Sequence, residues 1–201
     1  MSGNGVVIID SGGANIASLR FALERLGVVA ELTTDAATIQ AAGHVILPGV
    51  GAAAAAMQRL RASGLTELIP ALEQPVLGIC LGMQLLAEAS EEDSAECLGI
   101  FPGVAGKLSA SPNSPVPHMG WSRVSVTKQH PLIKDIDSGS YFYFLHSYAL
   151  PVADYALATA SHSGDFTAIL SHRNFFAAQF HPERSSAAGA KLLANFLELQ
   201  P

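Results

Sequence analysis

Cysteine is scarce in this sequence, which has only Cys80 and Cys97 among its 201 residues. Two cysteines in a chain of this length do not make a disulfide framework, and no Cys-x-x-Cys pair or Cys/His cluster indicates a zinc site. No basic segment followed by a long apolar stretch marks the N-terminal region, and no apolar run is long enough to cross a bilayer. We therefore expect a chain without metal or other cofactor that works in the reducing cytoplasm.

Positive charge is also in short supply. Eleven Lys and Arg stand against seventeen Asp and Glu, which gives a net charge of −6. Phosphate backbones and anionic lipids repel such a chain, so we expect neither nucleic acid nor membrane as a partner. Hydrophobic residues make up 49% of the sequence, enough to bury the core of one domain spanning residues 1–201. The low charge density leaves room for an apolar face that a partner protein covers.

Short β-branched runs alternate with helix-forming segments in the first half of the chain. We expect strands at residues 5–10, 28–34, 44–51 and 75–80, and helices at 16–27, 52–64, 65–73 and 81–91. This alternation predicts right-handed βαβ units. After a Ser/Pro-rich loop, the second half has several strand-like segments and a closing helix at 185–200. The predicted class is α/β: one domain with a mostly parallel open sheet, helices on both faces, and additional antiparallel strands in the second half.

The segment Gly78-Ile79-Cys80-Leu81-Gly82 has the G-x-nucleophile-x-G form of a nucleophile elbow, with cysteine as the nucleophile. The sharp turn from strand to helix strains the backbone of the nucleophile and needs small neighbours. Such a thiol begins a helix, where the dipole favours the thiolate, and the amide of the next residue faces a forming oxyanion. Taken alone, the segment fits a buried structural cysteine between two packing glycines equally well.

A thiolate nucleophile needs a base, and the base needs a group that orients it. His181 follows an apolar strand-like run and precedes Pro182 and Glu183. In extended backbone His181 and Glu183 point the same way, so Glu183 could accept from one ring nitrogen while the other faces Cys80. The alternative is an ordinary histidine at a strand end beside a surface carboxylate. Together with the elbow, the spacing favours a Cys-His-Glu triad.

Other histidines divide into two groups. His118, in VPHMGW, and His146, in FLHSY, lie in segments too apolar for ordinary loops, so they are candidate site or interface residues. The remaining four lie near turns and are expected to face solvent: His44, His130, His162 and His172. Cys97 has neither an elbow nor a neighbouring base and is expected to be a small packing residue.

The segment LPGVG, Leu47–Gly51, ends the third predicted strand. Loops at the carboxyl ends of parallel strands line the ligand crevice of such sheets, so we expect this loop beside the elbow. Its amides could supply a second oxyanion donor. An ordinary strand-to-helix turn is the alternative.

Taken together, these motifs resemble the class I (triad) glutamine amidotransferases. The combination of GICLGMQLL with QFHPE is specific for that family. VPHMGW and FYFLHSY resemble its glutaminase subunits of imidazole glycerol phosphate synthase, rather than those of GMP synthetase, anthranilate synthase or carbamoyl phosphate synthetase. The resemblance implies hydrolysis of glutamine to glutamate and ammonia through a thioester on Cys80. It also implies a cyclase partner, a (β/α)₈ barrel that receives the ammonia in histidine biosynthesis.

The resemblance also implies roles for individual residues. Cys80 would be the nucleophile, His181 the general acid and base, and Glu183 its orienter. The remaining implied residues are the oxyanion donors Leu81 and Val50 or Gly51; the glutamine contacts Gln84, Ser147 and Tyr148; and the regulatory or partner-facing Asn15, His118, Met119, Trp121 and Arg184. Asn15 is expected to hold the PGVG segment with its amide turned away until the partner binds.

Some positions depart from the family pattern. Ser11 stands where the family has tyrosine, and Arg184 where it has lysine. Neither touches the expected triad. Two alternatives remain. The glutaminase of pyridoxal phosphate synthase is disfavoured because its Gly-Gly-Glu-Ser signature is absent, and a non-catalytic binding module is disfavoured by the intact Cys, His and Glu.

Overall fold

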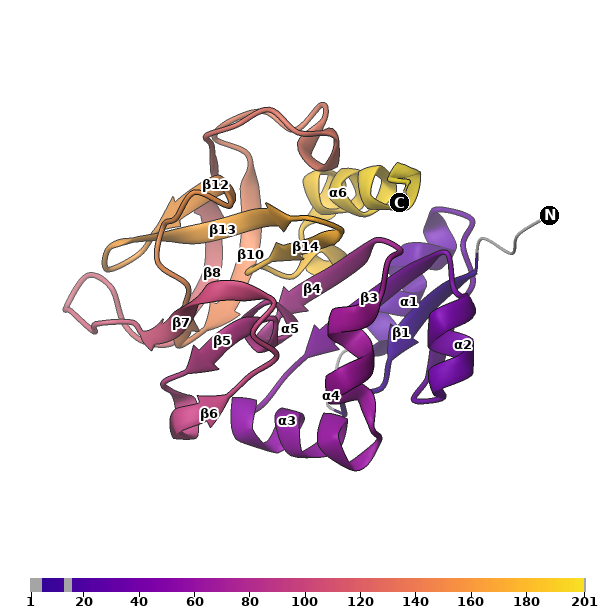
Figure 1. Cartoon of the computed structure of the whole chain (residues 1–201). Coiled ribbons are helices and arrows are strands. Elements are labelled where there is room, and N and C mark those ends of the chain that lie inside the picture. Colours follow the sequence, from indigo (N-terminus) through magenta and orange to yellow (C-terminus); the bar gives the residue numbers. More distant parts are fainter. Residues whose placement is uncertain (1–4, 13–15, 201) are drawn as a thin grey trace.

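The computed structural model describes residues 5–12 and 16–200, and its main sheet has the strand order β2-β1-β3-β4-β14-β13-β12-β9 (Figure 1). Five neighbouring strands are parallel: β2 (Ala30–Thr33), β1 (Val6–Ile9), β3 (His44–Gly49), β4 (Val76–Cys80) and β14 (Phe175–Ala178). Three antiparallel strands extend the sheet: β13 (Asp165–His172), β12 (Ala156–Ser161) and β9 (Ser125–Val126). The prediction of a mostly parallel sheet with antiparallel additions is confirmed.

Helices cover both faces of this sheet. They are α1 (Ile16–Arg25), α2 (Ala36–Ala41), α3 (Ala53–Ala62), α4 (Leu65–Leu68), α5 (Leu81–Leu85) and α6 (Ser186–Glu198). Because side chains alternate along a strand, Val6 and Ile8 pack into one core with α1 and α6, whereas Val7 and Ile9 pack into the other with α2, α3, α4 and α5. Both faces of β1 are therefore buried, as its continuous apolar run predicts. No helix in the described part of the chain is long and apolar enough to span a membrane.

Two smaller sheets complete the second half of the chain. One pairs β8 (His118–Arg123) with β10 (Tyr141–His146), and the other has the order β11-β7-β5-β6, formed by β11 (Tyr148–Ala149), β7 (Phe101–Lys107), β5 (Ala87–Ser90) and β6 (Ala95–Glu96). In the β8–β10 ribbon, His118 lies opposite His146 and Met119 opposite Leu145. The two histidines share the inner face of the ribbon, and the next pair shares the outer face.

Several expected elements differ from the structure. The helix expected at 81–91 ends at Leu85, and β5 begins two residues later, because amides of the distant segment 98–101 donate to the carbonyls of Leu85, Leu86 and Ala87. The helix expected at 65–73 is α4 followed by a 3₁₀ turn, Ile69–Ala71. Helix α2 was not expected, although its first turn is capped by Asp35, whose carboxylate accepts from the Thr38 amide at 2.8 Å.

Candidate active site

Cys80 occupies a strained turn between β4 and α5. Its backbone angles are φ 54° and ψ −110°, in a region that residues with a side chain rarely adopt. Such a conformation costs about 1–3 kcal/mol and persists only where the surrounding structure holds it. This strain favours the elbow interpretation over that of an inert packing cysteine.

The two glycines of the elbow permit a close approach of backbones. A Cβ at Gly82 would lie 1.8 Å from the carbonyl oxygen of Leu47, on the neighbouring strand β3. A Cβ at Gly78 would lie 2.9 Å from the carbonyl carbon and oxygen of Gly82. Because neither approach tolerates a methyl group, α5 can begin directly against β3 and β4 only with glycine at both positions.

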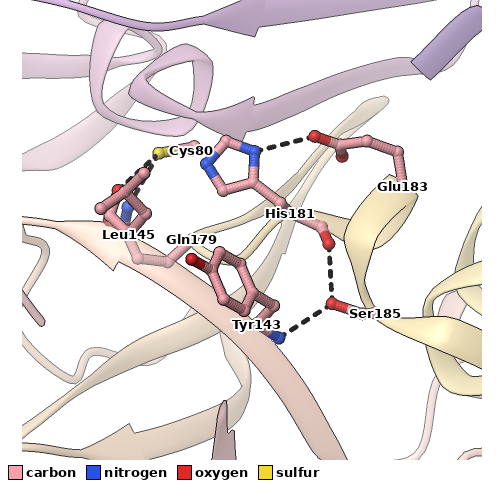
Figure 2. A network of polar contacts seen from close by, with 7 residues as sticks. All are labelled: Cys80, Tyr143, Leu145, Gln179, His181, Glu183 and Ser185. Carbon is pink, nitrogen blue, oxygen red and sulfur yellow. Dashed lines mark hydrogen bonds and ion pairs between the residues drawn. The ribbon is translucent and has the colours of Figure 1, made fainter. Parts of the chain in front are cut away.

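Cys80 opens onto a cavity of about 520 Å³. The thiol donates to the carbonyl of Leu145 at 3.5 Å, and the amide nitrogen of Gln179 lies 4.0 Å from the sulfur (Figure 2). The walls of the cavity are formed by Val50, Gly51, Cys80, Leu81, Gln84, Glu92, Pro117, Leu145, His146, Ser147, Tyr148, His181 and Arg184. A cavity of this size, with a few polar groups set among apolar ones, is typical of a site for a small molecule.

His181 lies between Cys80 and Glu183. Its Nδ1 is 2.9 Å from Oε1 of Glu183, and its other ring nitrogen is turned toward the sulfur of Cys80 (Figure 2). Both partners of the His181–Glu183 pair have nearly buried side chains. The orientation of the pair differs in origin from the prediction, because residues 182–184 form a 3₁₀ turn rather than extended backbone. The turn itself brings the two side chains together.

The backbone of His181 is tied to β10. Its amide donates to the carbonyl of Tyr143 at 2.9 Å. The hydroxyl of Ser185 donates to the carbonyl of His181 at 2.7 Å and accepts from the amide of Tyr143 at 2.9 Å (Figure 2). Ser185 was not predicted from the sequence. It locks the turn that carries the histidine against a strand of another sheet.

Two opposing effects act on the pKa of His181. Burial lowers it, but hydrogen bonds and charge interactions with Cys80 and Glu183 outweigh burial and raise the pKa of His181 to about 10. The imidazolium is therefore the favoured form at neutral pH. In this state the ring can pair with a thiolate and can deliver a proton to a leaving amine.

The segment after β3 lies beside the elbow, as expected. Gly49 pairs with Cys80 in the β3–β4 ladder, and Val50 and Gly51 line the cavity together with Leu81. A Cβ at Gly49 would lie 2.9 Å from Cβ of Leu81, so this glycine is required by packing.

Ser11 anchors the start of this segment. Its hydroxyl donates to the carbonyl of Pro48 at 2.7 Å, and Nε of Arg59 donates to the carbonyl of Ser11. Asn15, which we expected to hold the same segment, lies outside the described residues.

Gln84 and Tyr148 are joined by a hydrogen bond in the cavity wall. Nε2 of Gln84 donates to the Tyr148 carbonyl at 2.8 Å and to Oε1 of Gln179 at 3.3 Å. Gln179 was not predicted from the sequence, although a glutamine in the apolar run FFAAQF was a usable signal. Glu92 was also missed. It is the only carboxylate among the described wall residues, and it accepts from the amide of Ala53 at 2.8 Å.

The expected partner-facing residues do not lie together. Met119 and Trp121 are 67% and 51% exposed on the outer face of β8, whereas His118 is 3% exposed on the inner face. Arg184 lines the cavity, with its guanidinium 4.3 Å from the ring centroid of Tyr143. His44 was expected to face solvent but is buried, because its Nε2 reaches the carbonyl of Leu199.

Comparison with known proteins supports the same interpretation. The model of the glutamine amidotransferase class-I family matches residues 7–199. The chain is 50% identical over 194 residues to "Imidazole glycerol phosphate synthase subunit HisH" of Xylella fastidiosa (strain Temecula1 / ATCC 700964), with 96% of this chain and 97% of the relative covered. It is 51% identical over 195 residues to "Imidazole glycerol phosphate synthase subunit HisH 2" of Legionella pneumophila (strain Paris), with 97% and 98% covered.

Solved structures share the fold at lower sequence identity. A putative GMP synthase protein from Thermoplasma acidophilum superimposes with a TM-score of 0.74 at 20% identity, covering 96% of this chain and 92% of that chain. PurLQS from Thermotoga maritima superimposes with a TM-score of 0.71 at 18% identity, covering 98% of each. From the family match and the close relatives, the chain belongs to the class-I glutamine amidotransferase family.

Proposed function

We propose that this chain is the glutaminase subunit of an imidazole glycerol phosphate synthase, built as one amidotransferase domain over residues 1–201. It hydrolyses glutamine to glutamate and ammonia. The observation that carries the proposal is the strained Cys80, which opens onto a cavity and faces the His181–Glu183 pair. Relatives about 50% identical over nearly their whole length are named as subunits of this synthase.

The chemistry proceeds by acyl transfer. The thiolate of Cys80 attacks the side-chain amide carbon of glutamine, and the oxyanion is received by the amide of Leu81 with that of Val50 or Gly51. The imidazolium of His181 gives its proton to the nitrogen, so ammonia leaves and a glutamyl thioester remains. His181, now neutral, takes a proton from water, which attacks the thioester and releases glutamate and the thiol. Glu183 orients the ring throughout.

The cavity wall fits free glutamine as the substrate. The substrate carries an ammonium and a carboxylate besides its side-chain amide. Glu92 lines the cavity and supplies the negative charge that an ammonium requires. Gln84 and the backbone of Ser147 and Tyr148 line the same cavity and supply hydrogen bonds for the rest of the amino acid.

An exposed apolar surface supports a protein partner. The outer face of the β8–β10 ribbon presents Met119, Trp121, Tyr141 and Leu145. Large apolar side chains gathered on one exposed face mark an interaction site. The partner that we propose is the cyclase of the synthase, which is a (β/α)₈ barrel that uses the ammonia in the cytoplasm.

Covalent labelling tests the assignment. 6-Diazo-5-oxo-L-norleucine mimics glutamine and alkylates a nucleophile that faces its side chain. We expect stoichiometric modification of Cys80, read by peptide mass spectrometry, with Cys97 unmodified and with protection by glutamine. Cys97 is an internal control, because burial raises the pKa of its thiol to about 11. Labelling that ignores Cys80, or that glutamine does not slow, would contradict the proposal.

A further inference from the structure

A chain of hydrogen bonds runs from β8 into the cavity wall through two buried histidines. Oγ of Ser122 lies 2.8 Å from Nε2 of His118, and Nδ1 of His118 lies 3.1 Å from Nε2 of His146. Nδ1 of His146 lies 2.9 Å from the carbonyl oxygen of Tyr148. The same carbonyl accepts the side-chain amide of Gln84. These contacts, the Ser122–His118–His146 chain, therefore end at the two wall residues assigned to glutamine.

The direction of every bond in the chain follows from its last member. A carbonyl oxygen only accepts, so Nδ1 of His146 carries a hydrogen. A neutral ring carries one N–H, so Nε2 of His146 accepts from Nδ1 of His118. Nε2 of His118 then accepts from the hydroxyl of Ser122. One arrangement of hydrogens satisfies all three side chains, and it delivers a donor to the Tyr148 carbonyl.

Both rings are held neutral by their surroundings. Burial lowers the pKa of His118 to about 4, and the neighbouring His162 lowers it further. Burial lowers the pKa of His146 to about 3 against the bond to Tyr148, with His118, His162 and His181 also opposing a charge. His118 is sandwiched between the rings of Phe144 and His162, at centroid distances of 4.9 and 4.1 Å. Because both rings stay neutral, the hydrogen-bond direction is stable at neutral pH.

We propose that Ser122, His118 and His146 are positioning residues for glutamine binding: their chain aims the Tyr148 carbonyl, and through that carbonyl it fixes the side-chain amide of Gln84. This inference rests on the proposed glutaminase function. The carbonyl accepts two donors, one from His146 and one from Gln84. Removing the His146 donor frees the carbonyl to turn, and Gln84 then loses its defined orientation.

A role in packing alone would not require this chemistry. The two rings are surrounded by Phe144 and Phe166, so apolar side chains could fill the same space. Burying polar groups costs free energy unless each one is paired, and here each ring nitrogen is paired. The chain also stops short of the reacting sulfur. Its loss should therefore weaken substrate binding more than it slows the thiol.

The experiment separates binding from thiol reactivity in the full-length chain. Inactivation by 6-diazo-5-oxo-L-norleucine gives the concentration for half-maximal rate, KI, and the maximal rate. Alkylation of Cys80 by iodoacetamide, which lacks the amino-acid part, reports the thiol alone. We expect His146→Phe to raise KI about tenfold, the loss expected for one hydrogen bond, with the iodoacetamide rate within twofold of wild type.

Two further variants test position against packing. His146→Asn places an amide nitrogen where Nδ1 lies and can still donate to Tyr148, so we expect KI within about threefold of wild type. His162→Phe is the matched control: it keeps a ring stacked on His118, while the bond of His162 to the carbonyl of Pro115 lies outside the chain. We expect its KI to be unchanged. Ser122→Ala, at the half-buried end of the chain, should raise KI about threefold.

Several outcomes would overturn the inference. One is a KI for His146→Phe within twofold of wild type; another is a KI for His146→Asn as high as that of His146→Phe. If His146→Phe does not fold, as judged by circular dichroism, the test rests on Ser122→Ala and His146→Asn. An unchanged KI for Ser122→Ala would then reject the chain. Absence of labelling in the wild-type chain would reject the proposed function and, with it, this inference.

Discussion

Nδ1 of His181 and Oε1 of Glu183 lie 2.9 Å apart across one 3₁₀ turn, with both side chains nearly buried. The carboxylate orients the ring and favours its charged form. Glu183→Gln keeps an acceptor of the same shape but removes the charge, so we expect kcat to fall about 10- to 100-fold, far less than on loss of the nucleophile. Steady-state glutaminase kinetics measure it. A greater loss than that of Cys80→Ser would show that Glu183 is more than an orienter.

The site illustrates what local patterns predict. The spacing G-x-C-x-G predicted a turn with a nucleophile, and the structure gives Cys80 a positive φ between two glycines that admit no Cβ. The continuous apolar run at Val6–Ile9 likewise predicted a strand buried on both faces, which β1 is. Both features depend on residues close together in the sequence, so sequence carries them.

Features set by distant residues were missed. The helix after Cys80 ends early because amides from 98–101 take over its carbonyls, and nothing between 81 and 91 signals this. His118 was grouped with Met119 and Trp121 as partner-facing, although alternation along a strand puts it on the opposite face. Gln179 and Glu92 belong to the cavity wall through tertiary packing alone.

Gly82 should tolerate no side chain. Gly82→Ala would bring a methyl group against the carbonyl of Leu47, and the backbone on both sides is held in the sheet and helix. We expect the free energy of unfolding to fall by at least about 2 kcal/mol, measured by urea denaturation. Gly5→Ala is the matched control, because a Cβ there meets nothing within 4 Å. Equal stabilities of the two variants would show that the elbow can open to admit a methyl group.

Stability should fall in acid partly through the buried histidines. Because the pKa of His146 is about 3 in the folded chain, against 6.5 as the ordinary value, the unfolded chain binds more protons. This contribution to stability is complete above pH 6.5 and is lost as pH falls toward 3. His118, with a pKa of about 4, acts in the same direction. Over the same range, the histidine of highest pKa, His181, keeps its proton in the folded chain.

Urea denaturation at pH 7.5 and pH 4.5 measures this loss. His146→Asn cannot titrate, so its acid loss should be smaller than that of wild type by about 2 kcal/mol. His172→Asn serves as a control at a half-exposed histidine. If wild type and His146→Asn lose the same stability in acid, His146 is already protonated in the folded chain at pH 7.5 or remains neutral in the unfolded one.

The exposed face of the β8–β10 ribbon should carry much of the binding energy for the cyclase. Trp121 is half exposed, and burial of such a ring at the centre of an interface is often worth more than 2 kcal/mol. Calorimetry should give a Kd at least tenfold weaker for Trp121→Ala, with Cys80 labelling unchanged. Val29→Ala, at an apolar residue 80% exposed just before β2, should leave the Kd as it is. Similar affinities for all three proteins would place the partner elsewhere.

The most direct test of the account is product formation by the complex with its cyclase, measured for wild type and Cys80→Ser with either glutamine or an ammonium salt as the nitrogen source. Serine is close in size to cysteine but a far poorer nucleophile in this site, so glutamine-dependent turnover should fall by several orders of magnitude. Ammonium-dependent turnover at high pH should stay near the wild-type value, because ammonia bypasses the glutaminase. Undiminished glutamine-dependent turnover in Cys80→Ser would contradict the account.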